Sequence, residues 1–138
     1  MFREHGEFVV TRQGNILVAQ VYGAWNAETA KSYREAILKN IEPLNGDNWA
    51  LISNLEKWEL CTPDCQTLMM QLIVESKQKG LKREAIVNSN TQSVKLDLFT
   101  RYSNLEPSEN TDTSFLRQFV KTNIEAENWL QSEGFSQQ

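Results

Sequence analysis

The chain has very little of what metal and nucleophilic sites are built from: one histidine, His5, and two cysteines, Cys61 and Cys65, among 138 residues. Structural zinc is held mainly by Cys and His, so its ligands would have to come largely from carboxylates, and we expect no metal and no cofactor. His5 has no recognisable serine, cysteine or metal-ligand partner, which argues against catalysis. We interpret the two cysteines as ordinary reduced thiols.

Glycine is also scarce, at 6 residues, and neither of the phosphate-binding patterns G-x-x-x-x-G-K and G-x-G-x-x-G occurs. Ser53 and Thr67 have no histidine near them in the sequence to activate them as nucleophiles. No set of residues for acid-base, nucleophilic or metal chemistry is recognisable, so we expect a protein that is not an enzyme.

The chain carries a small net negative charge, with 14 Lys and Arg against 18 Asp and Glu. It has no cluster of basic residues that could follow a nucleic-acid backbone. Nucleic acid is therefore not an expected partner. No run approaches the roughly 18 apolar residues that span a bilayer, and the first residues, "MFREHGEF", do not resemble a signal peptide. By default these features predict a cytoplasmic protein.

What is present is a regular alternation of strand and helix signals. The segment "EFVVTRQGNILVAQVYG" predicts strands over residues 7–12 and 16–23, joined by a tight turn at Gly14 and Asn15. Further strands are expected at "WALIS" (49–53), at "EAIVNS" (84–89) and near 115–119. The second strand is apolar at consecutive positions, which is typical of a strand covered on both faces.

Four helices are expected between and after these strands. Asn26, Thr62 and Thr122 stand where helix N-caps are favoured, and a short helix is expected over 94–102. The apolar positions expected to pack are Leu68, Met69, Leu72 and Ile73 in the second helix, Ile124, Ala126, Trp129 and Leu130 in the last, and Trp49.

The predicted order is β-β-α-β-α-β-α-β-α in one domain, residues 1–138. An initial hairpin followed by alternating elements indicates an α/β fold, with a mostly parallel five-stranded sheet and an antiparallel N-terminal hairpin.

Three segments carry a family resemblance: "NILVAQVYGAWNAETAKSYREAI", "WALISNLEKWELCTPD" and "LRQFVKTNIEAENWL". Together with the element order, they resemble the SpoIIAA-like branch of the STAS (anti-sigma-factor-antagonist) superfamily. The resemblance implies a small STAS-like domain without a catalytic centre, which acts by binding proteins, lipid-like ligands or membrane surfaces.

In the sporulation antagonists of that branch, a strand ends in Asp and a phosphorylatable Ser begins the next helix. Asn54 matches the Asp, and Thr62, Pro63 and Asp64 fall where the acceptor is expected, so the Ser is absent. Thr62 is then the candidate phosphoacceptor, although its place before Pro63 is also explained by helix capping.

In a parallel sheet, ligands bind beyond the carboxyl ends of the strands. The residues expected at that edge are Trp25, Asn26, Asn54, Trp58, Thr62, Asn88, Ser89 and Asn90. These residues would form a binding cleft, in which the tryptophans line the apolar part and the helix N-termini favour an anion. Alternatively, the polar residues only cap helices and the tryptophans only cover the sheet.

Two functions remain open. The first is a regulatory domain that docks a protein partner through residues 58–64 and the start of the following helix. Under this hypothesis the domain could also form a homodimer. The alternative is a carrier or sensor of a small amphipathic, lipid-like ligand, or a protein associated with the membrane surface.

Overall fold

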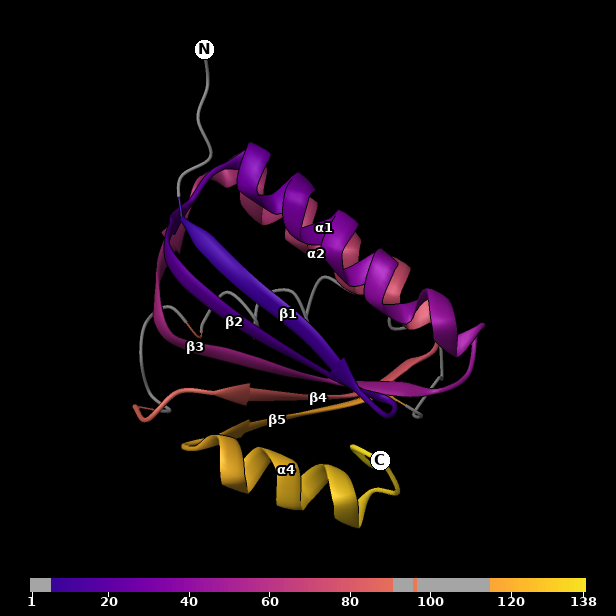
Figure 1. The fold of residues 1–138 in the computed structure, drawn as a ribbon. Helices are drawn as coiled ribbons and strands as arrows, with labels where there is room; N and C mark the ends of the chain where they lie inside the picture. Colours follow the sequence, from indigo (N-terminus) through magenta and orange to yellow (C-terminus); the bar gives the residue numbers. More distant parts are fainter. Residues whose placement is uncertain (1–5, 91–95, 97–114) are drawn as a thin grey trace.

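The structure is a computed structural model that describes residues 6–90, 96 and 115–138. A five-stranded sheet lies between two layers of helix, with α1 and α2 on one face and α4 on the other (Figure 1). The strands are β1 (Glu7–Gln13), β2 (Ile16–Trp25), β3 (Trp49–Cys61), β4 (Leu81–Val87) and β5 (Leu116–Val120). The helices are α1 (Ala27–Ile41), the 3-10 turn η1 (Glu42–Leu44), α2 (Pro63–Gln78) and α4 (Asn123–Ser132).

The strands lie in chain order across the sheet, β1-β2-β3-β4-β5. Only β1 and β2 are antiparallel, and every other pair is parallel. The predicted α/β fold, with its antiparallel N-terminal hairpin, is therefore confirmed. The helix predicted over 94–102 falls outside the described residues, apart from Leu96, which is buried.

The first turn forms as its sequence predicts. Gln13, the last residue of β1, pairs with Ile16, the first residue of β2, so the turn consists of Gly14 and Asn15 alone. Gly14 has a φ of 61°, which residues with a Cβ rarely adopt. The Asn15 carboxamide also accepts a hydrogen bond from the Ser136 amide at 2.9 Å, which ties the turn to the C-terminal segment.

The run of adjacent apolar residues in β2 reflects two separate cores. Leu17, Ala19 and Val21 belong to the core beneath α1 and α2, while Ile16 packs in the core beneath α4. Since successive side chains of a strand point to opposite faces, a strand covered on both sides must be apolar at consecutive positions. Burying each large aliphatic side chain contributes about 1.5–3 kcal/mol.

Helix α2 turns the predicted stripe to the core and extends it. Leu72 and Ile73 are buried, Leu68 and Met69 are half-buried against the same core, and Cys65 and Ser76 are buried as well. Ser76 lies one helical turn beyond Leu72 and Ile73, so the face continues through it although it is polar. All four predicted positions therefore pack against the core, and the burial of Cys65 and Ser76 was not predicted.

In α4, Ala126 and Leu130 are buried as predicted, and Trp129 is half-buried against the same core. Ile124 was expected to pack but is 68% exposed. It lies two residues before Ala126, a separation that does not share a helical face. Trp49 is fully buried, as predicted.

Strand β3 was predicted to end at residue 53 but continues to Cys61. The extra length has a partner because β2 continues to Trp25, which pairs with Cys61 after two register shifts. The pairing of β3 with β4 stops at Asn54 and Val87. Among the described strands, only β2 therefore pairs with residues 55–61 of β3. These residues include several charged side chains, which is why the prediction ended the strand before them.

Candidate functional site

The structure places the predicted site residues in two groups. The first group, at the far end of β3 and the starts of α1 and α2, contains Trp25, Asn26, Trp58 and Thr62. The second, around the end of β4, contains Asn54, Asn88, Ser89 and Asn90. They are separated because β3 continues beyond Asn54 as far as Cys61.

The residues of the second group form hydrogen bonds that link β3, β4 and α4. Asn54 donates to the Asn123 side chain at 3.1 Å and accepts from the Glu56 amide at 3.0 Å. The Glu56 carboxylate accepts from both the amide and the hydroxyl of Ser89. Asn88 donates to the Asn90 carbonyl at 2.6 Å. These bonds fix the chain where β4 ends.

Two members of the first group cap helices. Asn26 Oδ1 accepts from the Thr29 amide at 3.0 Å at the start of α1. Thr62 Oγ1 accepts from the Cys65 amide at 3.4 Å and donates to Asp64 Oδ1 at 2.5 Å. The hydrogen bond from Thr62 lowers the pKa of Asp64. The amide of Thr62 donates to the Trp25 carbonyl at 3.0 Å, which fastens the start of α2 to the end of β2.

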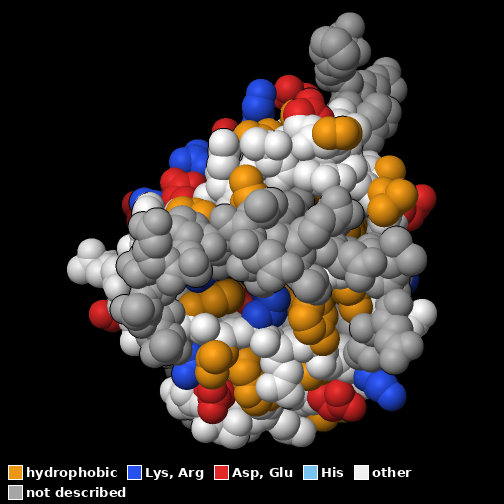
Figure 2. All heavy atoms as spheres, turned by 180° about the vertical axis from the view of Figure 1, so that it is seen from behind, with side chains coloured by type: hydrophobic (Ala, Val, Ile, Leu, Met, Phe, Trp, Pro, Cys, Tyr) orange, Lys and Arg blue, Asp and Glu red, His pale blue; other side chains and the backbone are white. Residues whose placement is uncertain are grey.

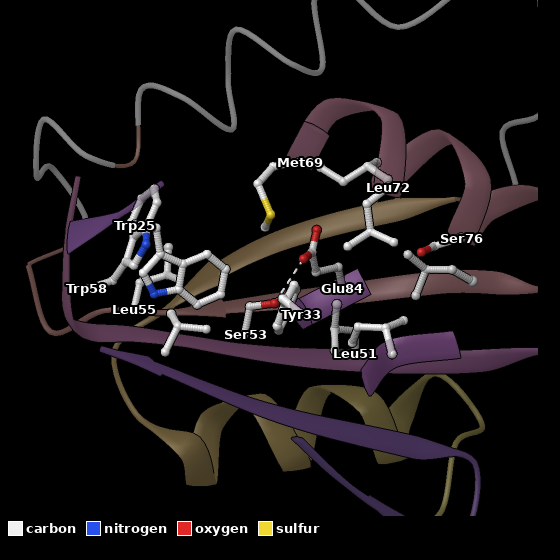
Figure 3. A pocket seen from close by; sticks show the side chains of 14 residues that line it. Trp25, Tyr33, Leu51, Ser53, Leu55, Trp58, Met69, Leu72, Ser76 and Glu84 are labelled. Atoms are coloured by element: carbon white, nitrogen blue, oxygen red, sulfur yellow. Dashed lines mark hydrogen bonds between the residues drawn. The ribbon is translucent and has the colours of Figure 1, made fainter. Parts of the chain in front are cut away.

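The two tryptophans of this group point inward. Trp58 is 5% exposed and Trp25 is also buried, and both line a cavity of about 40 Å³ between the sheet and helices α1 and α2 (Figure 3). The remaining lining comes from Val21, Tyr33, Ile37, Leu51, Ser53, Leu55, Met69, Leu72, Ile73, Ser76, Leu81 and Glu84. The wall is almost entirely apolar.

A polar wall interrupts this apolar lining. Ser53 Oγ donates to Glu84 Oε2 at 3.0 Å, and Arg117 Nε donates to Glu84 Oε1 at 2.7 Å. Glu84 is only 3% exposed, so its charge is neutralised inside the protein rather than by water. Ser53 and Glu84 face each other from neighbouring strands in Figure 3.

Tyr33 of α1 covers the same wall from above. Burial, followed by the charge of Glu84, raises the pKa of its phenol, against an opposing effect of Ser53. Its ring meets Trp25 edge to face at 5.1 Å between centroids, and Phe8 packs against both rings. Such contacts add rigidity at one end of the cavity.

Sequence reasoning missed the groups of this wall. Ser53 was considered only as a nucleophile, and Tyr33 was not among the expected site residues. Glu84 carried a usable signal, because a carboxylate beside "AIV" in a strand expected to be buried must find a partner. Nothing in the sequence identified that partner as Arg117.

Neither a metal site nor a membrane span is found in the described part of the chain. Residues 6–90, 96 and 115–138 contain no group of three or more Cys, His, Asp or Glu side chains placed to hold a metal. Within the same ranges, no helix has the length and hydropathy needed to cross a bilayer.

No family model matches the sequence, and no curated protein matches it. Among solved structures, the chain is similar to an uncharacterized protein of the DUF3478 family with a SpoIIAA-like fold, from Shewanella loihica PV-4. The two share 14% sequence identity and a TM-score of 0.66, over 94% of this chain and 97% of the other. The fold is SpoIIAA-like. The predicted resemblance is thereby confirmed at the level of the fold. In this SpoIIAA-like domain the cavity lies between α1, α2 and the sheet.

Proposed function

We propose that this SpoIIAA-like domain is a non-enzymatic binding domain that holds a small amphipathic ligand between α1, α2 and the sheet. The supporting observation is the cavity itself, which has mainly apolar walls and a hydrogen-bonded pair, Ser53 and Glu84, on one of them. Ligand sites generally combine a mainly apolar lining with a few placed polar groups.

The present volume of about 40 Å³ has room for a few water molecules, since each needs about 10–15 Å³ on this measure. A larger ligand therefore has to displace a side chain. Met69 is suited to this role, because it is half-buried, reaches from α2 over the cavity, and has an unbranched, adaptable side chain (Figure 3).

The polar wall indicates the kind of head group. The charge of Glu84 is already balanced by Arg117 at 2.7 Å, so a second full charge would be buried without an opposite charge of its own. A hydroxyl can replace the Ser53–Glu84 hydrogen bond, donating to the carboxylate while it accepts from Ser53. The ligand we propose is therefore a neutral, largely apolar molecule with a hydroxyl at one end.

A brominated long-chain alcohol tests this proposal, because bromine quenches tryptophan fluorescence on contact and Trp25 and Trp58 line the cavity. We expect saturable quenching by the wild-type protein. Met69→Phe should weaken binding about tenfold, or about 1.4 kcal/mol, by filling the space above the polar wall with a rigid ring.

Met70→Phe is the matched control, since Met70 is the next residue of α2 but lines the outer groove between α1 and α2. It should bind like the wild type. Non-saturable quenching of the wild type, or equal losses in the two variants, would exclude binding in this cavity.

A second candidate, docking of a protein partner at the end of β3, has its own supporting observation. Leu60 is 60% exposed at the part of β3 that β2 alone borders among the described strands. The contact we propose is through Leu60, because Trp58 is buried and lines the cavity. Exposed apolar residues are common in protein interfaces.

Leu60→Asp should reduce recovery of a co-purifying protein, or convert a homodimer to a monomer in analytical ultracentrifugation. Ile124→Asp, at an equally exposed position on α4, is the control. Equal behaviour of the two variants and the wild type would argue against docking at β3.

A further inference from the structure

Strand β1 forms one edge of the sheet and lacks the features that usually protect such an edge (Figure 1). It pairs with β2 residue by residue from Glu7 to Gln13 without a register shift, and it pairs with no other strand among those described. Its sequence, EFVVTRQ, contains neither lysine nor proline. Proteins normally use such residues, bulges or very short strands to keep an edge from pairing with another chain. The regular edge of β1 is therefore suited to a further strand.

The hydrogen-bonding groups at this edge follow from the pairing of β2. The Asn15 carbonyl accepts from the Ala50 amide, so Asn15 faces β3 and the next residue, Ile16, faces β1. Because the two sides alternate along a strand, Gln13, which pairs with Ile16, faces β2, and so does every second residue before it. The residues between them turn their amides and carbonyls outward. These outward-facing residues are Phe8, Val10 and Arg12.

A second copy of β1, running antiparallel, matches this edge along its whole length. In the register centred on Val10, Val10 is opposite the partner's Val10, and Phe8 is opposite the partner's Arg12. Every outward-facing residue of both strands then occupies a hydrogen-bonded position. Opposite residues point to the same side of a sheet, so the α1 helices of the two copies lie on one side of the joined sheet. The edge of β1 is thus complementary to itself.

The charges of β1 favour the same arrangement. Glu7 is the first residue of the strand and Arg12 is the last but one, and both are exposed. An antiparallel copy places the carboxylate of one strand near the guanidinium of the other at each end, whereas a parallel copy in register would bring like charges together. Val9, which is 54% exposed, would lie opposite the partner's Thr11. Pairs of β-branched side chains suit adjacent strands.

Helix α1 packs on β1 and has small side chains on the flank that faces away from α2. Its Tyr33 meets Phe8 of β1 edge to face, and its Arg34 lines the groove towards α2. Ser32 and Ala36 are one helical turn apart and lie on the opposite flank from Arg34. The distance between packed helices depends on the side chains at their contact. Small residues on this flank therefore leave room for the α1 helix of a second copy beside the joined edge.

We propose that two copies of this domain pair through β1, in the antiparallel register centred on Val10, to form one continuous sheet with five strands from each copy. Charge alone indicates no other docking surface in Figure 2, where acidic and basic side chains of the described residues are interspersed. The inference is independent of the ligand proposed for the cavity, because β1 contributes no residue to the cavity lining. It also uses a different surface from Leu60 on β3.

Sedimentation velocity of the full chain over a range of protein concentrations tests this pairing. We expect the wild type to show a concentration-dependent equilibrium between monomer and dimer. Arg12→Pro should raise the dissociation constant of the dimer at least about tenfold, because each copy loses an outward-facing amide. Arg12→Ala is the matched control: it also removes the guanidinium, with its 2.7 Å hydrogen bond to the Gly14 carbonyl, but it keeps the amide. It should dimerise far better than Arg12→Pro.

A cross-link tests the register without depending on a proline variant. Cα atoms of opposite residues in a hydrogen-bonded pair are about 5.5 Å apart, which is within the range that a disulfide bridges. Val10→Cys should therefore form a dimer linked between the two introduced thiols under mild oxidation, as identified by peptide mapping. Val9→Cys is the control, because Val9 would lie opposite the partner's Thr11 and only diagonally from the partner's Val9. It should link poorly.

Three results would overturn the proposal. The first is a wild type that stays monomeric at every concentration. The second is equal dimerisation of Arg12→Pro and Arg12→Ala, or equal cross-linking of Val9→Cys and Val10→Cys. The third is a dimer that Leu60→Asp abolishes and Arg12→Pro does not, which would place the contact on β3 instead of β1.

Discussion

Arg117 and Glu84 form an ion pair inside the protein, with Nε and Oε1 2.7 Å apart and both side chains almost completely buried. They come from adjacent strands, β5 and β4, where Arg117 is directly opposite Glu84 in the register. The pair forms the back of the polar wall of the cavity, so its energetics govern both the stability of the sheet and the chemistry available to a ligand.

Arg117→Met is expected to lower the free energy of unfolding by about 3–5 kcal/mol, because it leaves the Glu84 carboxylate buried without its cation. Urea unfolding measures the change. Arg34→Met is the control: it breaks the ion pair between Arg34 and Glu75, which has a similar length of 2.8 Å but is far more exposed, and should cost no more than about 1 kcal/mol. Similar losses in both variants would show that the Arg117 pair is not desolvated in solution.

Adding Glu84→Leu to the Arg117→Met variant should recover much of the lost stability. The double variant no longer buries a carboxylate, and apolar replacements of buried ion pairs are often neutral. If the double variant is as unstable as Arg117→Met alone, lost packing rather than the uncompensated charge is the cause.

Tyr33 should make the protein sensitive to alkali. Its folded pKa is raised above the unfolded value of 10.0, so folding favours the neutral phenol. That contribution is fully present below about pH 10 and is lost as the pH rises further, since the unfolded chain ionises first. Tyr33→Phe should flatten the fall in unfolding free energy at alkaline pH, measured by urea titration at several pH values. An unchanged slope would mean that the phenol is accessible to hydroxide.

Gly80 and Gly46 offer a matched pair for substitution by alanine. Both have a positive φ, 107° at Gly80 and 85° at Gly46, so both substitutions add backbone strain. A Cβ at Gly80 would also lie 2.6 Å from the Asp47 carbonyl oxygen, whereas at Gly46 it meets nothing within 4 Å. We expect Gly46→Ala to cost about 1 kcal/mol and Gly80→Ala clearly more. Thermal unfolding distinguishes them, and equal midpoints would contradict the close approach at Gly80.

Thr62→Ala should cost about 1 kcal/mol of unfolding free energy, because it removes the side-chain cap of α2. Thr62→Asn keeps a capping oxygen and should recover most of this loss. Thr67→Ala is the control, since its hydroxyl bonds only to the Pro63 carbonyl within the helix. If Thr62→Ala is neutral, the cap role is wrong and the phosphoacceptor hypothesis for Thr62 gains weight.

Local signals in the sequence were sufficient for the hairpin and the helix caps. Gly14 and Asn15 leave the backbone few alternatives to a tight turn, and Asn26 and Thr62 satisfy amides only three residues away. The adjacent apolar residues of β2 likewise require cover on both faces. Each inference depends on neighbours within a few residues, which is why it could be made without the fold.

The sequence by itself determined the order of the described strands and helices and the α/β class, because propensity, capping and hydrophobic period are properties of short segments. Only the tertiary structure decided the length of β3, the inward orientation of Trp58, and the pairing of Ser53 and Arg117 with Glu84. Those two partners lie 31 and 33 residues from Glu84 in the chain. Which residues of neighbouring strands face each other depends on the register between strands, and register is set by the packing of the whole sheet.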